Sequence, residues 1–523
     1  MSLPETLSLL MFATACLGLM GGYNVAFTLS GVAVFFAAIG SALGIFDAQF
    51  FLAIPGRIFP IITREILIAV PLFVFMGVML ERSKIAEDLL ESMANLFGPL
   101  PGGLGIAVVI VGALLAASTG IVGATVVTMG LLSLPTMLAR GYAPSLAGGT
   151  IAASGTLGQI IPPSIVLVIL GDQISTALQE AQRSHGFESQ QVVSVGDLFA
   201  GALIPGLILV LFYALYVLMT GILKPAHAPS RPWPKDSSLR IFLIQAAKAM
   251  LPPILLMVAV LGSILTGYAT PTRAAALGAL GAILLGVIKL SDNKSACWAA
   301  YASLVAILSL IMLDLLGIDL RLGRHAVSAL ERVLIPVAII IAIIGLFCAI
   351  YAMRPLVKSQ LLGDVSRKTL HITCMVFVIL IGATIFSLIF RGFGGDELVA
   401  HFLESAPGGK WGAFALVMIM MFILGFFLDF IEITFVVVPL VAPPLIALGM
   451  DPIWLGVLMA LNLQTSFLTP PFGFALFYLQ GVAPPQLTTQ ALYRGVIPFI
   501  IIQFIVMGLV IAIPGLATYL PQG

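Results

Sequence analysis

Long apolar stretches are the feature that most constrains the fold of this 523-residue chain. Most are near twenty residues long, which is enough for an α-helix to cross about 30 Å of hydrocarbon. They lie at residues 6–21, 24–45, 65–80, 198–221, 241–266, 271–289, 297–318, 333–353, 369–390 and 492–515. Because these runs are continuous rather than alternating over about ten residues, they predict an all-α polytopic membrane protein and exclude a transmembrane β-barrel.

The charge content supports the same class of protein. Only 9% of the residues are charged, compared with about 25% in soluble domains. A soluble enzyme of this length needs far more polar surface, so that class is excluded. The formal net charge of +1 gives no reason to expect a nucleic-acid partner.

Four further apolar segments are interrupted near their middle. Residues 104–139 and 412–448 carry polar residues or glycines there, which predicts re-entrant hairpins. Residues 144–177 and 453–480 contain the double prolines Pro162-Pro163 and Pro470-Pro471. Proline removes a backbone donor and clashes with the preceding turn, so these two segments are predicted to be broken helices. Broken backbone at membrane depth is tolerated only inside protein or beside a cavity.

The broken segments form two copies. A shift of 308 positions superposes six marker residues of the first copy on identical residues of the second. These are Pro135, Ala139, Gly141, Pro144, Pro162 and Pro163, which fall on Pro443, Ala447, Gly449, Pro452, Pro470 and Pro471. We therefore infer two structural repeats.

Loop charge predicts the orientation of the repeats, because Lys and Arg favour the cytoplasmic side. The loops at 222–240 and 354–368 are basic and are expected inside, whereas 172–197 is acidic and is expected outside. The count of spans then places both chain ends outside and lets the two hairpins enter from opposite faces. The arginine-rich loop at 321–332 disagrees, since it falls outside. Inverted repeats with paired broken helices are typical of secondary transporters.

The same markers predict the domain organisation. Two amphipathic segments, Lys84–Phe97 and Asp396–Ser405, are expected to lie in the membrane interface. The predicted parts are first-half scaffold helices (1–97), a transport repeat with hairpin and broken helix (98–177), scaffold helices (198–290), a two-helix insertion (291–361), an arm helix and linker (362–405), a second transport repeat (406–485) and a C-terminal helix (486–523).

The chemistry expected at the breaks is binding rather than catalysis. The sequence has neither a GxxxxGK[ST] nucleotide loop nor an HExxH motif, so no enzyme activity is predicted. Broken helices free backbone carbonyls for a cation and present amides to an anion. Close helix packing is the alternative reason for small residues there. The candidate substrate-binding residues are Thr119, Ser154, Thr156, Pro162, Pro163, Gln464, Thr469 and Pro470. Gly155 is expected to adopt a backbone conformation that a β-carbon would disfavour.

Two carboxylates interrupt the second hairpin. Asp429 and Glu432 lie three positions apart in an otherwise uncharged run. A carboxylate at membrane depth needs a cation, a hydrogen-bond donor or water. We predict that Asp429 coordinates a sodium ion or orients its ligands, and that Glu432 can bind a proton. The alternative is that a turn raises both side chains to the interface.

At these residues the chain resembles a known family. The motifs are Pro71–Gly77, Pro101–Leu104, Gly158–Ser164, Leu198–Gly201, Thr270–Thr272, Leu424–Asp429 and Leu468–Gly473. Together they are similar to the large, DctM-type membrane subunit of tripartite ATP-independent periplasmic (TRAP) transporters. The resemblance implies a multi-pass protein of the bacterial inner membrane that imports a small organic acid by sodium symport and an elevator mechanism. It also implies two partners, a small DctQ-type membrane subunit and a periplasmic substrate-binding protein.

The resemblance further implies where sodium binds. In the family these sites lie between each hairpin tip and its partner break. The corresponding residues here are Ser118, Gly120, Gly155 and Gly158 in the first repeat, and Asp429, Asn462, Thr465 and Ser466 in the second. Two other functions stay open at this point. One is a stand-alone ion-coupled organic anion carrier, and the other is a membrane scaffold or channel subunit without coupled transport.

Overall fold

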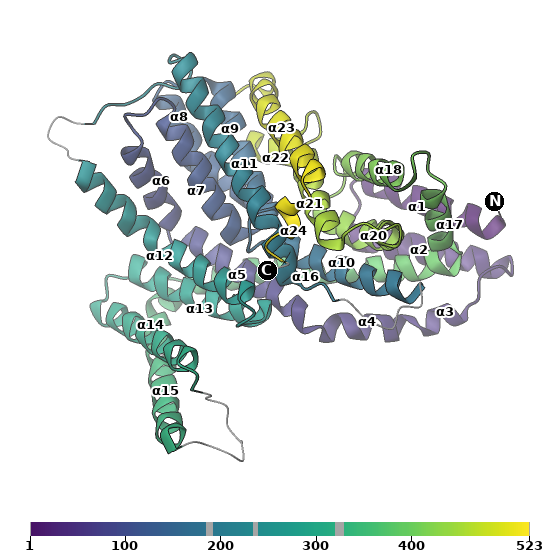
Figure 1. Ribbon diagram of the computed structural model, residues 1–523, viewed down its shortest axis with the longest axis horizontal. Coiled ribbons are helices and arrows are strands. Elements are labelled where there is room, and N and C mark those ends of the chain that lie inside the picture. Colours follow the sequence, from purple (N-terminus) through teal and green to yellow (C-terminus); the bar gives the residue numbers. More distant parts are fainter. Residues whose placement is uncertain (1, 185–191, 234–238, 319–328, 522–523) are drawn as a thin grey trace.

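The computed structural model describes residues 2–184, 192–233, 239–318 and 329–521. Throughout these ranges the regular structure is helical, without a strand, which confirms the predicted all-α class (Figure 1). Ten of the described helices are long and apolar enough to cross a membrane, or up to twelve if each of two bent pairs counts as one span. The bent pairs are Gln49–Thr63 with Glu65–Arg82, at 53°, and Phe430–Val436 with Val438–Ala447, at 56°.

The described residues of the first half form eleven α-helices and two short 3-10 helices. They are α1 (Leu3–Met20), α2 (Val25–Ala42), α3 (Gln49–Leu52), α4 (Ile54–Thr63), η1 (Glu65–Ile68), α5 (Ala69–Arg82), α6 (Ile85–Leu96), α7 (Gly103–Thr119), α8 (Val122–Ala139), α9 (Pro144–Thr156), η2 (Leu157–Gln159), α10 (Ile165–Ser184) and α11 (Val195–Leu223). Helices α3 and α4 were not expected from the sequence, because each is too short to register as a membrane span.

The second half begins with α12 and includes the predicted insertion as α14 and α15. Its helices are α12 (Leu239–Leu265), α13 (Pro271–Leu290), α14 (Lys294–Leu315), α15 (Ala329–Lys358), α16 (Leu361–Gly392), α17 (Gly395–Glu404), α18 (Gly409–Leu424), α19 (Phe430–Val436), α20 (Val438–Ala447), α21 (Pro452–Leu468), α22 (Phe474–Gln480), α23 (Thr489–Ala512) and α24 (Gly515–Thr518). Helices α14 and α15 pack on each other and project from the remainder of the molecule (Figure 1).

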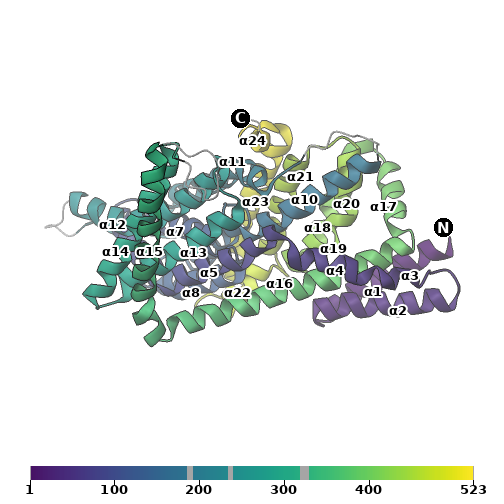
Figure 2. The same ribbon diagram turned by 90° about the horizontal axis from the view of Figure 1, so that it is seen from below.

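Equivalent helices of the two halves pack in equivalent ways. The repeat offset makes α16 the counterpart of α5. Helix α5 packs on α13, which belongs to the second half, and α16 packs on α2, which belongs to the first half. Helix α16 runs along much of the length of the molecule, from the side of α15 to that of α1 and α2 (Figure 2). At the centre, Gln464 Nε2 donates to Thr156 Oγ1 at 3.4 Å. These two residues are 308 positions apart, so the axis that relates the two repeats passes between α9 and α21.

The most completely buried helices are the broken ones. Every residue from Leu146 to Thr156 in α9 is buried, as is every residue from Trp454 to Leu468 in α21. By contrast, only 17% of the apolar window of α15 is buried, as expected for a helix that faces lipid. The polar side chains of α9 and α21 are therefore surrounded by protein, which is where membrane proteins keep such groups.

Candidate functional site

The first hairpin turns at a glycine. Helix α7 ends at Gly120, which has a φ of +61° and donates its N–H to the carbonyl oxygen of Ala116 at 2.9 Å. A left-handed backbone favours glycine. A β-carbon at Gly120 would also lie 2.9 Å from the backbone nitrogen of Ile165, at the start of α10. The hairpin tip is therefore held directly against the broken helix.

Glycines let the first hairpin approach the first break closely. A β-carbon at Gly158 would lie 2.7 Å from the Ala116 carbonyl oxygen, and one at Gly112 would lie 2.6 Å from Ser154 Cβ. Gly155 lies inside α9 without a positive φ, so the predicted special conformation is wrong. Glycine is needed there because a β-carbon would lie 2.3 Å from Val126 Cγ2 of α8.

The second hairpin places Asp429 at the beginning of a helix. After α18 and a turn, Asp429 is the N-cap of α19, and its Oδ1 accepts from Phe430 N at 2.7 Å. Glu432 Oε2 accepts from the Asp429 N–H at 3.2 Å, which completes a capping box. Both carboxylates are half-buried. The sequence suggested that these two carboxylates bind an ion or a proton. Because they lie three positions apart, they also accept hydrogen bonds from free N–H groups at the start of the helix.

The second break is fastened to the second hairpin by side chains of α21. Asn462 Nδ2 donates to Met418 O, and Ser466 Oγ donates to Phe422 O, both at 2.8 Å. A β-carbon at Gly425 would lie 2.4 Å from Ser466 Oγ, so glycine is required at this approach. These contacts bring the two predicted sodium-binding segments of the second repeat together. The donors of Asn462 and Ser466 are engaged, while their oxygen lone pairs still offer acceptor capacity.

The predicted substrate residues are only partly brought together. Thr156 and Gln464 meet at the repeat axis, as described above. Ser154 Oγ donates to Thr150 O at 2.6 Å, within its own helix. Thr465 and Thr469 likewise donate to carbonyls one turn earlier, at 2.7 Å. Pro162, Pro163 and Pro470 form the turns that follow α9 and α21. The side chains of Ser118 and Thr119 lie outside the described part of the structure.

Sequence reasoning did not include Gln159 among the candidate site residues. Its side chain is fully buried beside the first break, and neither Oε1 nor Nε2 has a hydrogen-bond partner in the described structure. Gln464 Oε1 is unpartnered in the same way. Buried amides are normally satisfied, so these groups fit a polar ligand at the breaks. The available signal was the position of Gln159 within the motif Gly158–Ser164.

The oxygen donors at the breaks suit a monovalent cation better than a transition metal. Among the described residues, no three His, Cys, Asp or Glu side chains gather in one place. The site offers the Ala116 carbonyl beside Gly158 and the hydroxyl and amide oxygens of α21. Hard cations such as sodium accept such neutral oxygen ligands.

Ion pairs link α10 to the end of the short helix α4 and to the long helix α16. Arg64, which follows α4, pairs with Asp172 at 2.6 Å, and Arg391 of α16 pairs with Glu180 at 2.7 Å. Arg64, Glu180 and Arg391 line a cavity of about 570 Å³ at the predicted outer side, together with Arg57 and Arg183. At the other face, Glu81 binds Lys368 at 3.1 Å and accepts from Thr128 of α8 at 3.0 Å. None of these long-range contacts was anticipated from the sequence.

Comparison with known proteins identifies the family. The model of the tripartite ATP-independent periplasmic transporter DctM component matches residues 9–312 and 289–516. The C4-dicarboxylate TRAP transporter large permease protein DctM of Vibrio cholerae is 27% identical over 459 residues, covering 87% of this chain and 85% of that protein. The sialic acid TRAP transporter large permease protein SiaM of the same organism is 26% identical and covers 96% of each chain.

A solved structure supports the fold. The YdaH transporter of Alcanivorax borkumensis superposes with a TM-score of 0.55 at 13% identity, over 98% of this chain and 99% of that one. At this identity the likeness concerns the fold alone. The family model, in contrast, spans nearly the whole chain and includes both hairpins and both breaks. The chain is therefore a member of the DctM family, the large permease component of TRAP transporters.

Proposed function

We propose that the chain is the permease of a sodium-coupled, binding-protein-dependent importer of a small organic acid. The observation that carries the proposal is that each hairpin packs on its own broken helix and that the two broken helices meet at one axis, where Gln464 Nε2 donates to Thr156 Oγ1. Such an arrangement offers freed carbonyls and helix ends at membrane depth to a substrate and a coupling ion.

The proposed roles divide between the two repeats. In the first, Gly120, Gly155 and Gly158 allow backbone oxygens such as that of Ala116 to approach the break closely enough to hold sodium. In the second, the oxygens of Asp429, Asn462, Thr465 and Ser466 would hold sodium. Sodium binding supplies the coupling to its gradient. The substrate anion is assigned to the axis beside Thr156, where the second N–H of Gln464 Nε2 and the unpartnered amide of Gln159 offer donors, since the Thr156 hydroxyl itself donates to Ala153 O at 2.8 Å.

The family supports the proposed substrate class and partners. The two relatives described above are named for a C4-dicarboxylate and for sialic acid, both of which are carboxylates. A tripartite transporter has two further components, for which we propose a small membrane subunit and a periplasmic binding protein at the bacterial inner membrane. In the proposed elevator mechanism, the hairpins and broken helices move together against the other helices.

Reconstitution in liposomes tests the proposal. The permease, its small subunit and the cognate binding protein are combined, and uptake of labelled succinate or N-acetylneuraminate is measured with and without an inward sodium gradient. We expect uptake only with the gradient and the binding protein. Equal uptake without the binding protein would favour the stand-alone carrier. An uptake rate that is the same with and without the sodium gradient would exclude sodium coupling. A Gln159→Leu variant keeps the volume of the side chain and should lose substrate uptake while remaining folded.

A further inference from the structure

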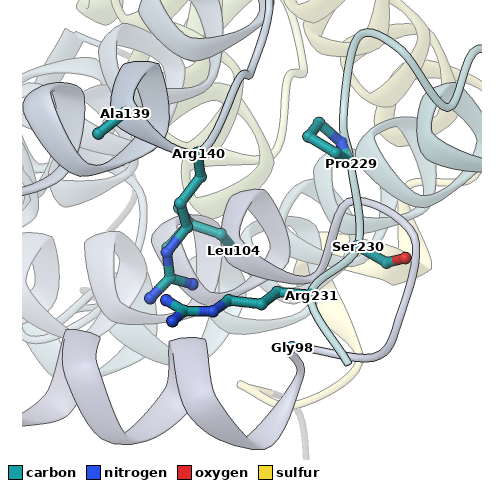
Figure 3. A pocket seen from close by; sticks show the side chains of 7 residues that line it. All are labelled: Gly98, Leu104, Ala139, Arg140, Pro229, Ser230 and Arg231. Atoms are coloured by element: carbon teal, nitrogen blue, oxygen red, sulfur yellow. The ribbon is translucent and has the colours of Figure 1, made fainter. Parts of the chain in front are cut away.

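Two arginines share a pocket on the predicted cytoplasmic face. The pocket has a volume of about 270 Å³ and lies where the base of the first hairpin meets the loop between α11 and α12. Arg140, directly after α8, and Arg231, in the loop, point their guanidinium groups toward one another across it (Figure 3). Leu104 and Pro229 form apolar parts of the wall.

Backbone hydrogen bonds fix the loop that carries Arg231. Arg231 N donates to Gly98 O at 2.8 Å, Gly102 N donates to Ala228 O at 3.1 Å, and Ala143 N donates to His227 O at 2.9 Å. The loop is thus tied both before α7 and after α8, the two ends of the hairpin. The two arginines come from segments about ninety positions apart in the sequence. These hydrogen bonds fix the position of the backbone at Arg231 relative to the backbone next to Arg140.

No carboxylate of the described residues pairs directly with the two charges in this pocket. The charge of Glu91 in α6 acts on Arg140 and raises its pKa, but this is the smallest of the four influences on that group. Burial, together with the positive charge of Arg231, lowers the pKa of the Arg140 guanidinium below its usual range. Arg140 is half-buried and Arg231 is exposed. Two like charges held this close, one of them partly removed from water, are unfavourable unless an anion joins them.

We propose that Arg140 and Arg231 bind a phosphate group at the inner membrane face. Guanidinium groups present planar pairs of N–H donors that match the oxygens of phosphate, often two at a time. The group can belong to an anionic phospholipid of the inner leaflet or to free phosphate in the cytoplasm. Such a ligand would join the base of the first hairpin to the loop that leads to α12. This assignment is independent of the substrate and sodium sites at the breaks.

The test compares the purified wild type with Arg140→Gln/Arg231→Gln. A matched control, Lys358→Gln/Arg367→Gln, removes two exposed cations from the same predicted face that have no ion-pair partner in the described structure. One arm incorporates each protein in nanodiscs of phosphatidylcholine and phosphatidylglycerol and measures retained phosphatidylglycerol by native mass spectrometry. The other arm measures the shift in Tm caused by inorganic phosphate, relative to chloride at equal ionic strength.

The two arms distinguish the two sources of phosphate. We expect the double variant to lose most of the retained phosphatidylglycerol or most of the phosphate-induced Tm shift, as a loss of about tenfold in affinity would produce, while the control keeps the wild-type value. Loss of phosphatidylglycerol retention identifies a lipid, and loss of the phosphate-induced Tm shift identifies the free ion. Equal behaviour of the wild type and the double variant in both arms would overturn the proposal. If the double variant does not elute as a folded protein, Ser230→Glu replaces it, since a carboxylate at the pocket should displace phosphate.

Discussion

At Asp429, one carboxylate has two possible roles, and they can be separated. Its Oδ1 caps α19 by accepting from Phe430 N, whereas the proposed sodium site needs its charge. Asparagine caps a helix about as well as aspartate does. We therefore expect Asp429→Asn to keep its thermal stability but to require about tenfold more sodium for half-maximal uptake, the change produced by about 1.4 kcal/mol.

Sodium titration of uptake in proteoliposomes is the measurement, and Asp429→Ala serves as a comparison. The alanine variant loses both cap and charge, so its Tm should fall as well, by a stability loss of about 0.5–2 kcal/mol. An unshifted sodium requirement in Asp429→Asn would show that the carboxylate serves only the helix start.

Gly158 is expected to be intolerant of even one methyl group. A β-carbon there would lie 2.7 Å from the Ala116 carbonyl oxygen, and backbone cannot move aside as a flexible side chain does. We expect Gly158→Ala to destabilise the protein by about 1–3 kcal/mol and to abolish uptake. The control is Gly508→Ala in α23, where a β-carbon meets nothing within 4 Å. Fluorescence-detected thermal unfolding in detergent measures both, and equal Tm values for the two variants would contradict the close-approach argument.

At the scale of helices, the pair Arg391–Glu180 tests whether α10 moves relative to α16. The two side chains lie 2.7 Å apart, so cysteines at these positions can be joined by a short bifunctional thiol reagent after the four native cysteines are replaced. In an elevator mechanism this link prevents motion. We expect Glu180→Cys/Arg391→Cys to lose uptake on cross-linking and to regain it when a cleavable linker is cut.

The control cross-links α14 and α15, which pack on each other and are not expected to move apart during transport. Ala306 in α14 and Gly345 in α15 lie so close that a β-carbon on Gly345 would be 2.8 Å from Ala306 Cβ. Cross-linking Ala306→Cys/Gly345→Cys should leave uptake unchanged. Full uptake by the cross-linked 180/391 pair would show that α10 and α16 do not move apart during transport.

At the scale of the whole molecule, the inverted repeats require opposite faces for two exposed loops. Val192, before α11, and Ala226, after α11, are both exposed, and the apolar α11 lies between them. A membrane-impermeant maleimide should label Val192→Cys in intact cells and Ala226→Cys only after permeabilisation. Labelling of both from one side would contradict the predicted orientation.

Local sequence determined the helical elements and their breaks. Continuous apolar runs can satisfy their backbone in lipid only as helices, and the double prolines had to interrupt the segments around 162–163 and 470–471. The 308-residue offset was equally readable, and the contact between Thr156 and Gln464 agrees with it. Helix α4 was not predicted because Pro60, Arg57 within the helix and Arg64 directly after it leave only a short apolar run.

Only the tertiary structure decided how individual residues are used. Sequence could not show that Gly155 is required by Val126, because that contact depends on the packing of α8 on α9. The capping box of Asp429 and Glu432 fits a local pattern, but only the structure shows that a helix starts there. The pairs Arg64–Asp172 and Arg391–Glu180, and the meeting of Arg140 with Arg231, join positions about 90 to 210 residues apart. Apolar periodicity reports which segments enter the membrane, whereas charge partners are selected by packing between helices, which no local pattern encodes.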